Sequence, residues 1–153
     1  MAVKAPDDQV LATVLNSRFD VRRAALFDTS AQVAAAQGIQ SLPEPLGLTT
    51  SVQHYEPGHV QITLSGPAPA GSSLIVSENF YPGWVATVDG KSARTGRADY
   101  TLIGVELPQG ARNVDLLFTS PAYQRGKTIT WVAIIIGILM LSAGTWRDRR
   151  RLA

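Results

Sequence analysis

The sequence predicts a mainly β protein: an antiparallel β-sandwich with a short N-terminal helix and one C-terminal transmembrane helix. Short β-prone runs, separated by Gly, Pro, Asn or Asp, follow one another from residue 48 onward. Regular spacing of this kind is typical of a sandwich. The run from Thr128 to Trp146 carries no charge, and roughly 20 such residues span the hydrocarbon layer of a bilayer.

These patterns divide the chain of 153 residues into a single domain with appendages. The expected parts are an N-terminal lead of residues 1–47, a sandwich core of residues 48–125, a transmembrane helix of residues 126–147 and a basic cytoplasmic tail of residues 148–153. Within the lead, Val10, Leu11, Val14 and Leu15 have helical spacing, and Asp7 or Asp8 is the expected N-cap. A strand over residues 23–27 and a loop over residues 31–45 complete it.

The strongest local β signal lies around Asp89-Gly90, two residues that accept the positive φ of a type I′ hairpin turn. Strand alternation places Trp84, Ala86 and Val88 on one face before this turn. A second hairpin is expected at residues 108–111. The predicted strands of the core are residues 51–55, 59–64, 73–79, 84–88, 100–107 and 113–119.

Charges beside the apolar run predict its orientation. The arginines that follow it outnumber Arg125 and Lys127, which precede it, and the more basic flank stays in the cytoplasm. The β-rich part is therefore expected outside the cytoplasm. The N-terminus has no signal-peptide core, so the chain is either the C-terminal piece of a longer polytopic protein, which we favour, or a tail-anchored protein with a cytoplasmic head. The four arginines are Arg147, Arg149, Arg150 and Arg151.

Composition argues against several functions. Cysteine is absent, which excludes disulfides and thiolate chemistry. The basic cluster follows the apolar run, has no interleaved aromatic residues, and therefore indicates membrane topology and no nucleic-acid partner. His54 and His59 flank a turn that contains Glu56, a pattern more typical of solvated loops than of metal sites, so no metal and no cofactor are expected. Ser17, Ser51 and Ser65 lack a nucleophile elbow.

Two sets of side chains are candidates for binding. Carboxylate, amide and aromatic groups at Glu78, Asn79, Tyr81 and Trp84 match the needs of a carbohydrate surface. The competing interpretation is structural, with Tyr81-Pro-Gly as a tight connection and Trp84 as a core anchor. Arg94 and Arg97 fit lipid phosphates or an anionic polymer, or serve solubility. Glu78 with Asp89 as an acid and base pair is disfavoured because the turn accounts for Asp89. No catalytic residue is predicted.

The run of residues 74–91, which contains Tyr81-Pro-Gly-Trp84 and Val88-Asp-Gly-Lys91, resembles the extracytoplasmic C-terminus of the YfhO family of bacterial polytopic membrane proteins. The resemblance covers residues 9–143. It implies a glycosyltransferase-like parent of the GT-C type that uses polyprenyl-phosphate-linked sugars on cell-envelope polymers. The family's acidic loop and multi-helix lipid-carrier site would lie upstream, so no catalytic residue carries over.

The expected function is accordingly a non-catalytic extracytoplasmic accessory domain of a membrane glycosyltransferase-like protein. Its expected partners are the lipid bilayer, the upstream transmembrane part of the parent protein and a cell-envelope polysaccharide. The alternative is a stand-alone membrane-anchored carbohydrate-binding or adhesion domain, and a free-standing enzyme is a third class.

Overall fold

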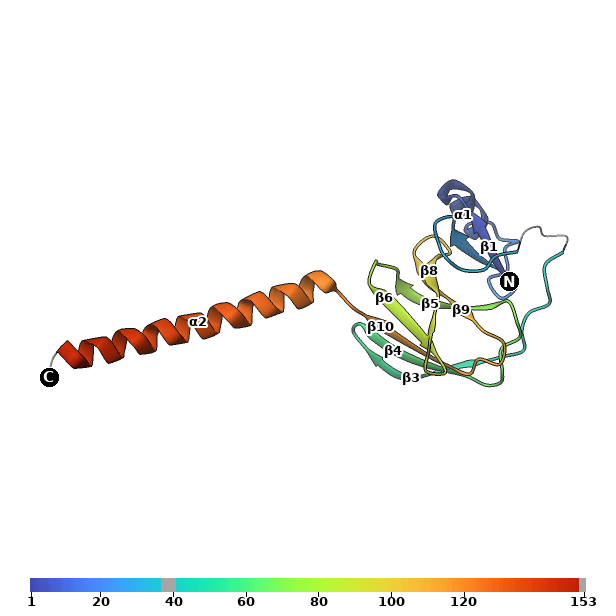
Figure 1. Ribbon diagram of the computed structural model, residues 1–153. Helices are drawn as coiled ribbons and strands as arrows, with labels where there is room; N and C mark the ends of the chain where they lie inside the picture. Colours follow the sequence, from blue (N-terminus) through green and yellow to red (C-terminus); the bar gives the residue numbers. More distant parts are fainter. Residues whose placement is uncertain (37–40, 152–153) are drawn as a thin grey trace. The chain divides into compact units, whose positions relative to one another are not determined.

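The computed structural model describes residues 1–36 and 41–151, except for the side chains of residues 121, 122, 124 and 141–151. The chain forms two compact units, Met1–Thr119 and Ser120–Ala153. The first unit contains the strands and the short helix α1, and the second contains the helix α2 (Figure 1).

One sheet of the first unit has the strand order β1-β2-β8-β9-β5. Its β1 and β2 are parallel, and α1 (Asp7–Val14) lies between them in sequence, while the other neighbours are antiparallel. The strands are β1 (Ala2–Ala5), β2 (Ala25–Asp28), β8 (Thr95–Ala98), β9 (Leu102–Leu107) and β5 (Ser72–Asn79). We call it the first sheet.

The second sheet is antiparallel throughout its described pairings, with the order β3-β4-β10-β6-β7. Its strands are β3 (Thr50–Glu56), β4 (His59–Leu64), β10 (Asn113–Phe118), β6 (Trp84–Val88) and β7 (Lys91–Ala93). The register shifts between Val52 and His54, which leaves Gln53 as an extra residue in β3.

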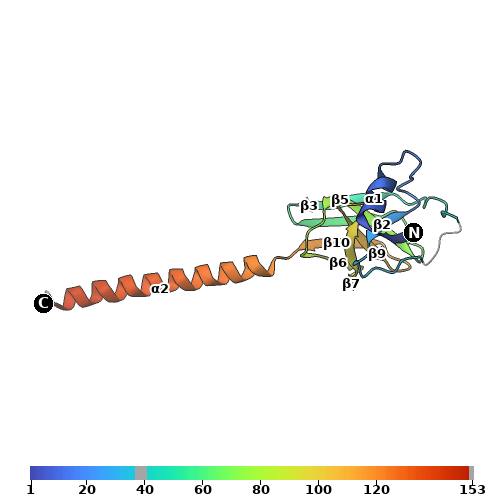
Figure 2. The ribbon, with the colours of Figure 1, turned by 90° about the horizontal axis from the view of Figure 1, so that it is seen from above.

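The two sheets share one apolar core, as in a sandwich (Figure 2). Leu116 of the second sheet and Ile103 with Val105 of the first are fully buried. Strand alternation sends every second residue of these strands into this layer. A second cluster, centred on the fully buried Phe27, covers the other face of the first sheet with N-terminal residues.

The mainly β architecture with two helices confirms the coarse prediction. Strands β4 and β6 have the expected bounds, and Asp89 and Gly90 have φ angles of 48° and 76°, as the hairpin turn requires. Three strands, β1, β7 and β8, were not predicted. They are short and carry small or polar residues, so their periodicity is weak.

Two local predictions are wrong. Residues 108–111 do not close a hairpin, because β9 pairs with β5 and β8 while β10 pairs with β4 and β6 in the opposite sheet. Both edges of β10 are hydrogen-bonded, one to β4 and the other to β6, so neither edge is left for β9. The N-cap of α1 is Pro6, without a side-chain cap, and Asp7 lies in the first turn.

A helix forms where the sequence predicts one, as α2 (Pro121–Arg151). Within the residues that the structure describes, no helix combines the length and hydropathy needed to cross a membrane. The transmembrane assignment therefore has no support from the described residues. Side chains of the last part of the expected span and of the basic tail, residues 141–151, lie outside that description.

The N-terminal segment is tied to the first sheet by Arg97 of β8. Its guanidinium donates to Asp7 of α1 at 2.5 Å and to Asp28 of β2. Hydrogen bonds from Ser30, followed by the one from Arg97, lower the pKa of Asp28 from 3.8 to about 2. One cation therefore joins α1, β2 and β8.

The close packing of Phe27 on β9 generates the first prediction. A Cβ added at Gly104 would overlap the Phe27 ring and lie 2.8 Å from the Cβ of Ala98. We expect Gly104→Ala to lower the free energy of unfolding by about 1–3 kcal/mol, the usual cost of overpacking. Thermal unfolding measures it, with Gly47→Ala as the control because no atom lies within 4 Å of its added Cβ. Equal stability of both variants would contradict the packing.

The second prediction concerns acid. A carboxyl with a lowered folded-state pKa stabilises the fold above its unfolded-state pKa, and this stabilisation is lost as pH falls through the folded value. We expect Asp28 to contribute fully above about pH 4 and to lose its contribution towards about pH 2. Asp28→Asn should lower the melting temperature at pH 7, and the difference from wild type should shrink between these values.

The control for this experiment is Asp8→Asn, since Asp8 is exposed and has no ion pair within the described residues. Burial raises the pKa of Asp99, which gives that group the opposite pH dependence. Both proteins contain Asp99, so the difference between wild type and Asp28→Asn isolates Asp28. A difference that stays constant down to pH 2 would contradict the assignment.

Candidate functional site

The structure distributes the six sequence-predicted binding residues over several places. Three of them, Asn79, Tyr81 and Arg97, line one depression of about 330 Å³. Sequence reasoning missed two of its other lining residues, Tyr100 and Thr101, because it assigned them to the start of a strand, whereas β9 begins at Leu102. We call this hollow the tyrosine depression; it is lined by Asn79, Phe80, Tyr81, Arg97, Tyr100 and Thr101.

The charged groups near the tyrosine depression are engaged within the protein. Arg97 also donates from Nη1 to the Tyr100 carbonyl at 3.1 Å, in addition to its two carboxylates. Glu78 accepts the Tyr55 hydroxyl, and this hydrogen bond raises the pKa of Tyr55. The depression therefore offers aromatic surface and the Asn79 amide to a ligand, with little net charge.

Trp84 and Arg94 lie apart from that depression. Trp84 is half-buried against the shared core, and its ring meets Phe118 edge-on at a centroid distance of 5.5 Å. Arg94 is exposed, 3.8 Å from Glu106, and lines a separate hollow of about 190 Å³. Neither side chain lines the tyrosine depression, although the Trp84 N–H donates to the Tyr81 carbonyl at 3.3 Å.

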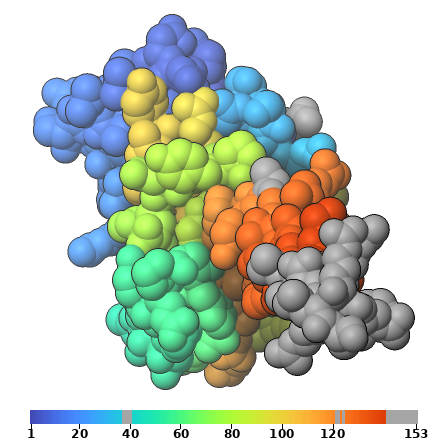
Figure 3. All heavy atoms as spheres, turned by 90° about the vertical axis from the view of Figure 1, so that its left-hand side faces the viewer, coloured from blue at the N-terminus to red at the C-terminus, as the bar shows by residue number. Residues whose placement is uncertain are grey.

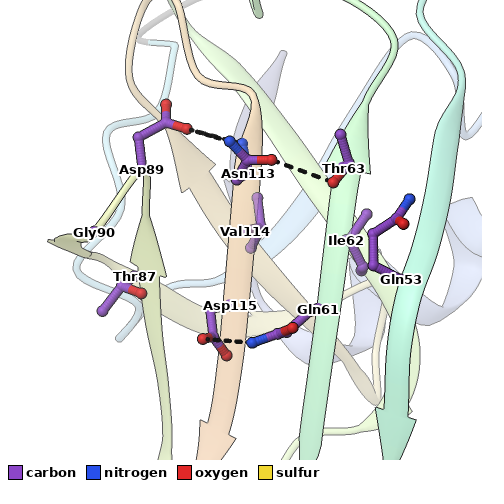
Figure 4. A pocket seen from close by; sticks show the side chains of 10 residues that line it. All are labelled: Gln53, Gln61, Ile62, Thr63, Thr87, Asp89, Gly90, Asn113, Val114 and Asp115. Carbon is purple, nitrogen blue, oxygen red and sulfur yellow. Dashed lines mark hydrogen bonds between the residues drawn. The ribbon is translucent and has the colours of Figure 1, made fainter.

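The outer face of the second sheet carries a hollow of about 300 Å³ that the sequence analysis did not single out (Figure 4). Its lining side chains are hydroxyls, amides and carboxylates on neighbouring strands. They alternate with the core residues Ile62 and Val114, and this alternation was the available signal. We call the hollow the polar ladder; it is formed by Gln53, Gln61, Thr63, Thr87, Asp89, Asn113 and Asp115.

Hydrogen bonds run across the strands of the polar ladder. Gln61 Nε2 donates to Asp115 at 3.1 Å (Figure 4). Thr63 Oγ1 donates to Asn113 Oδ1 at 3.2 Å, and Asn113 Nδ2 donates to Asp89 at 3.1 Å. These bonds fix five of the ladder side chains relative to one another, those of Gln61, Thr63, Asp89, Asn113 and Asp115. Such preorganisation reduces the entropy lost on binding.

Two carboxylates give the polar ladder a negative character. Asp89 accepts the backbone N–H groups of Asn113 at 2.9 Å and Arg112 at 3.1 Å, and these bonds lower its pKa. Asp115 lies 2.9 Å from His59 Nε2. Both groups repel anions, so the surface is matched to a neutral or cationic ligand.

The two histidines lie on the same face, with ring centroids 4.9 Å apart. His54 is 3.5 Å from Glu56, and His59 contacts Asp115. Among the described residues, no group of three or more His, Asp or Glu side chains has the arrangement needed to hold a metal ion.

The largest described cavity, about 850 Å³, runs along β5. Its lining is mostly apolar, as at Leu74, but it also contains the carboxylate residue Asp99. Asp99 is nearly buried, with a positive φ of 44°. Its carboxylate accepts Leu26 N–H at 2.9 Å, and its own N–H donates to the Leu26 carbonyl at 2.8 Å. These two bonds clamp β2 to the β8–β9 turn, which gives Asp99 a structural role.

Comparison with known proteins found a single kind of similarity. No curated protein and no solved structure was found to match the chain. The family described as bacterial membrane protein YfhO matches residues 47–130, which include β3 to β10 and the start of α2. More than half of the chain is matched, and the chain therefore belongs to the YfhO family of bacterial membrane proteins.

Proposed function

We propose that this chain is a non-catalytic, membrane-anchored accessory domain that holds a neutral cell-envelope polysaccharide outside the cytoplasm for the rest of a YfhO-family protein. The observation that carries the proposal is the polar ladder, a preorganised face of hydroxyl, amide and carboxylate groups in a chain of a membrane-protein family. Its parent is proposed to be glycosyltransferase-like, and the upstream transmembrane part is its proposed partner.

Anchoring is assigned to α2. The run from Thr128 to Trp146 is uncharged, and its described apolar side chains, such as Ile129, Ile135 and Met140, are exposed. A helix of a water-soluble protein normally keeps a polar face, whereas an apolar surface on all sides suits lipid. Arginines after Trp146 favour a cytoplasmic C-terminus and an outward-facing sandwich.

Sugar recognition is assigned to the polar ladder. Each sugar hydroxyl both donates and accepts hydrogen bonds, and Gln61, Thr87 and Asn113 offer both functions. Asp89 and Asp115 disfavour an anionic polymer through like-charge repulsion. A neutral polysaccharide fits this combination better than a phosphate-rich one.

The anchoring proposal predicts that charge inside α2 releases the chain from the membrane. One arginine near the centre of a spanning helix costs about 2.5–3.5 kcal/mol, so Ile135→Arg with Ile136→Arg should move the chain into the soluble fraction after alkaline extraction. Ile135→Leu is the control and should stay with the membrane. Retention of the double-arginine variant in the membrane would contradict the assignment.

The sugar proposal predicts binding of a neutral oligosaccharide. We expect chitohexaose to bind the whole chain in detergent micelles, measured by calorimetry, and polygalacturonate to bind more weakly. Removing hydrogen bonds by Gln61→Ala with Thr87→Val should weaken chitohexaose binding about tenfold or more, equivalent to about 1.4 kcal/mol. Gln9→Ala, an exposed change on α1 outside the second sheet, is the control.

Two outcomes would overturn the assignment to the polar ladder. Chitohexaose affinity that is unchanged in the double variant would exclude it. Loss of affinity in Tyr81→Ala alone would instead place the sugar in the tyrosine depression.

A further inference from the structure

The exposed aromatic side chains of the sandwich unit gather at one end. Among the described residues of Met1–Thr119, these are Tyr55, Tyr81, Tyr100 and Phe118, with exposed fractions of 63%, 60%, 39% and 39%. They come from the end of β3, the β5–β6 loop, the β8–β9 turn and the end of β10. We call these four residues the aromatic rim.

Strand directions place these segments at the same end. The register pairs Asn79 with Leu102, and Trp84 with Phe118, so the β5–β6 loop, the β8–β9 turn and the end of β10 are neighbours. Figure 3 shows the β3–β4 turn in green, the β5–β6 loop in yellow-green and the β8–β9 turn in yellow on one face of the unit.

Backbone hydrogen bonds lock the segments of the aromatic rim together. Phe118 N–H donates to the Gly58 carbonyl at 2.7 Å, and Phe80 N–H donates to the Thr101 carbonyl at 2.7 Å. Thr119 N–H donates to the Gly83 carbonyl at 2.8 Å, a close approach that requires glycine because an added Cβ would overlap the Thr119 carbonyl oxygen. The rim is therefore a fixed part of the sandwich.

The chain leaves the sandwich at this end. Only Thr119 and Ser120 separate Phe118 from Pro121, the first residue of α2. Arg125 and Lys127 follow, and the uncharged run begins at Thr128. Phe118 of the aromatic rim thus lies close in sequence to the proposed anchor.

We infer that the aromatic rim lies in the headgroup region of the bilayer and binds lipid there. Tyrosine rings favour this region because one end is apolar and the other hydrogen-bonds with water and headgroups. The exposed pair Val85 and Leu117, which face each other on β6 and β10, extends the apolar surface beside the rim.

The charges near the aromatic rim indicate which lipid it contacts. Glu56 is exposed and Glu78 accepts the Tyr55 hydroxyl, while Arg97 is already held by Asp7 and Asp28. Electrostatic attraction to anionic lipid needs free Lys or Arg side chains. Arg125 and Lys127 belong to α2 and not to the rim, so the rim itself suits zwitterionic headgroups, held by aromatic and apolar contact.

The inference rests on the proposed anchoring by α2, and a test must separate the two. The chain has no cysteine, so single cysteines can carry an environment-sensitive fluorophore in the whole chain reconstituted in phosphatidylcholine vesicles. Tyr81→Cys reports on the aromatic rim and Met140→Cys reports on α2. Gln109→Cys is the control, because it is exposed in the β9–β10 connection at the opposite end of both strands.

We expect headgroup nitroxide lipid to quench the label at position 81 at least threefold more than the label at position 109. Mid-chain nitroxide lipid should quench position 140 most strongly. Increasing salt from about 0.05 to about 0.5 M should leave quenching at position 81 unchanged, since such salt screens only electrostatic binding.

Each other outcome has a defined meaning. Equal quenching at positions 81 and 109 together with deep quenching at position 140 would overturn the rim inference and leave the anchor intact. No quenching at position 140 would overturn the anchor. Quenching at position 81 that disappears in high salt would replace aromatic contact by an electrostatic one and overturn the inference as stated.

Discussion

The structure depends on the burial of alternate residues of β10 between two antiparallel neighbours and against β9. Leu116 and Val114 point into the shared core, where they meet Ile103 and Val105, and all four are essentially inaccessible to water. Burying one large aliphatic side chain contributes about 1.5–3 kcal/mol. Because the side-chain period of a strand is two, this burial also determines which residues of β10 face solvent.

The polar ladder is a consequence of that register. Asn113 and Asp115 face outward because Val114 and Leu116 face inward, and their partners on β4 and β6 follow the same alternation. Asp89 has two roles there. Its positive φ forms the hairpin turn between β6 and β7, while its carboxylate holds the N–H groups of Arg112 and Asn113. A residue that the sequence explains by its turn thus also shapes the candidate surface.

Sequence reasoning succeeded where pattern and local chemistry agree. β4 alternates buried and partly exposed residues without interruption, and Asp89-Gly90 has a strong turn preference, so both were predicted. β8 was missed because Gly96 interrupts a four-residue strand. The prediction that β9 and β10 form a hairpin was wrong. Which strands pair depends on the sheet in which each apolar face is buried, and residues near the turn do not determine this. Burial also differs between neighbours in sequence: Tyr81 is exposed, whereas Trp84 is half-buried against the shared core.

The inferred position of the aromatic rim sets an upper limit on the distance between the polar ladder and the bilayer. Along a strand each residue advances about 3.3 Å, so Asp115 and Asn113 lie about 10 and 17 Å from Phe118. Under the inferred placement of the rim, a polysaccharide on the proposed ladder site would lie at most about this far from the membrane surface. In the proposed glycosyltransferase-like parent, a lipid-linked sugar donor would stay in the membrane, and its acceptor would have to approach the surface to react with it. Such an accessory domain, in which β10 carries part of the ladder and one rim residue, Phe118, would keep the acceptor within a thin layer next to the bilayer.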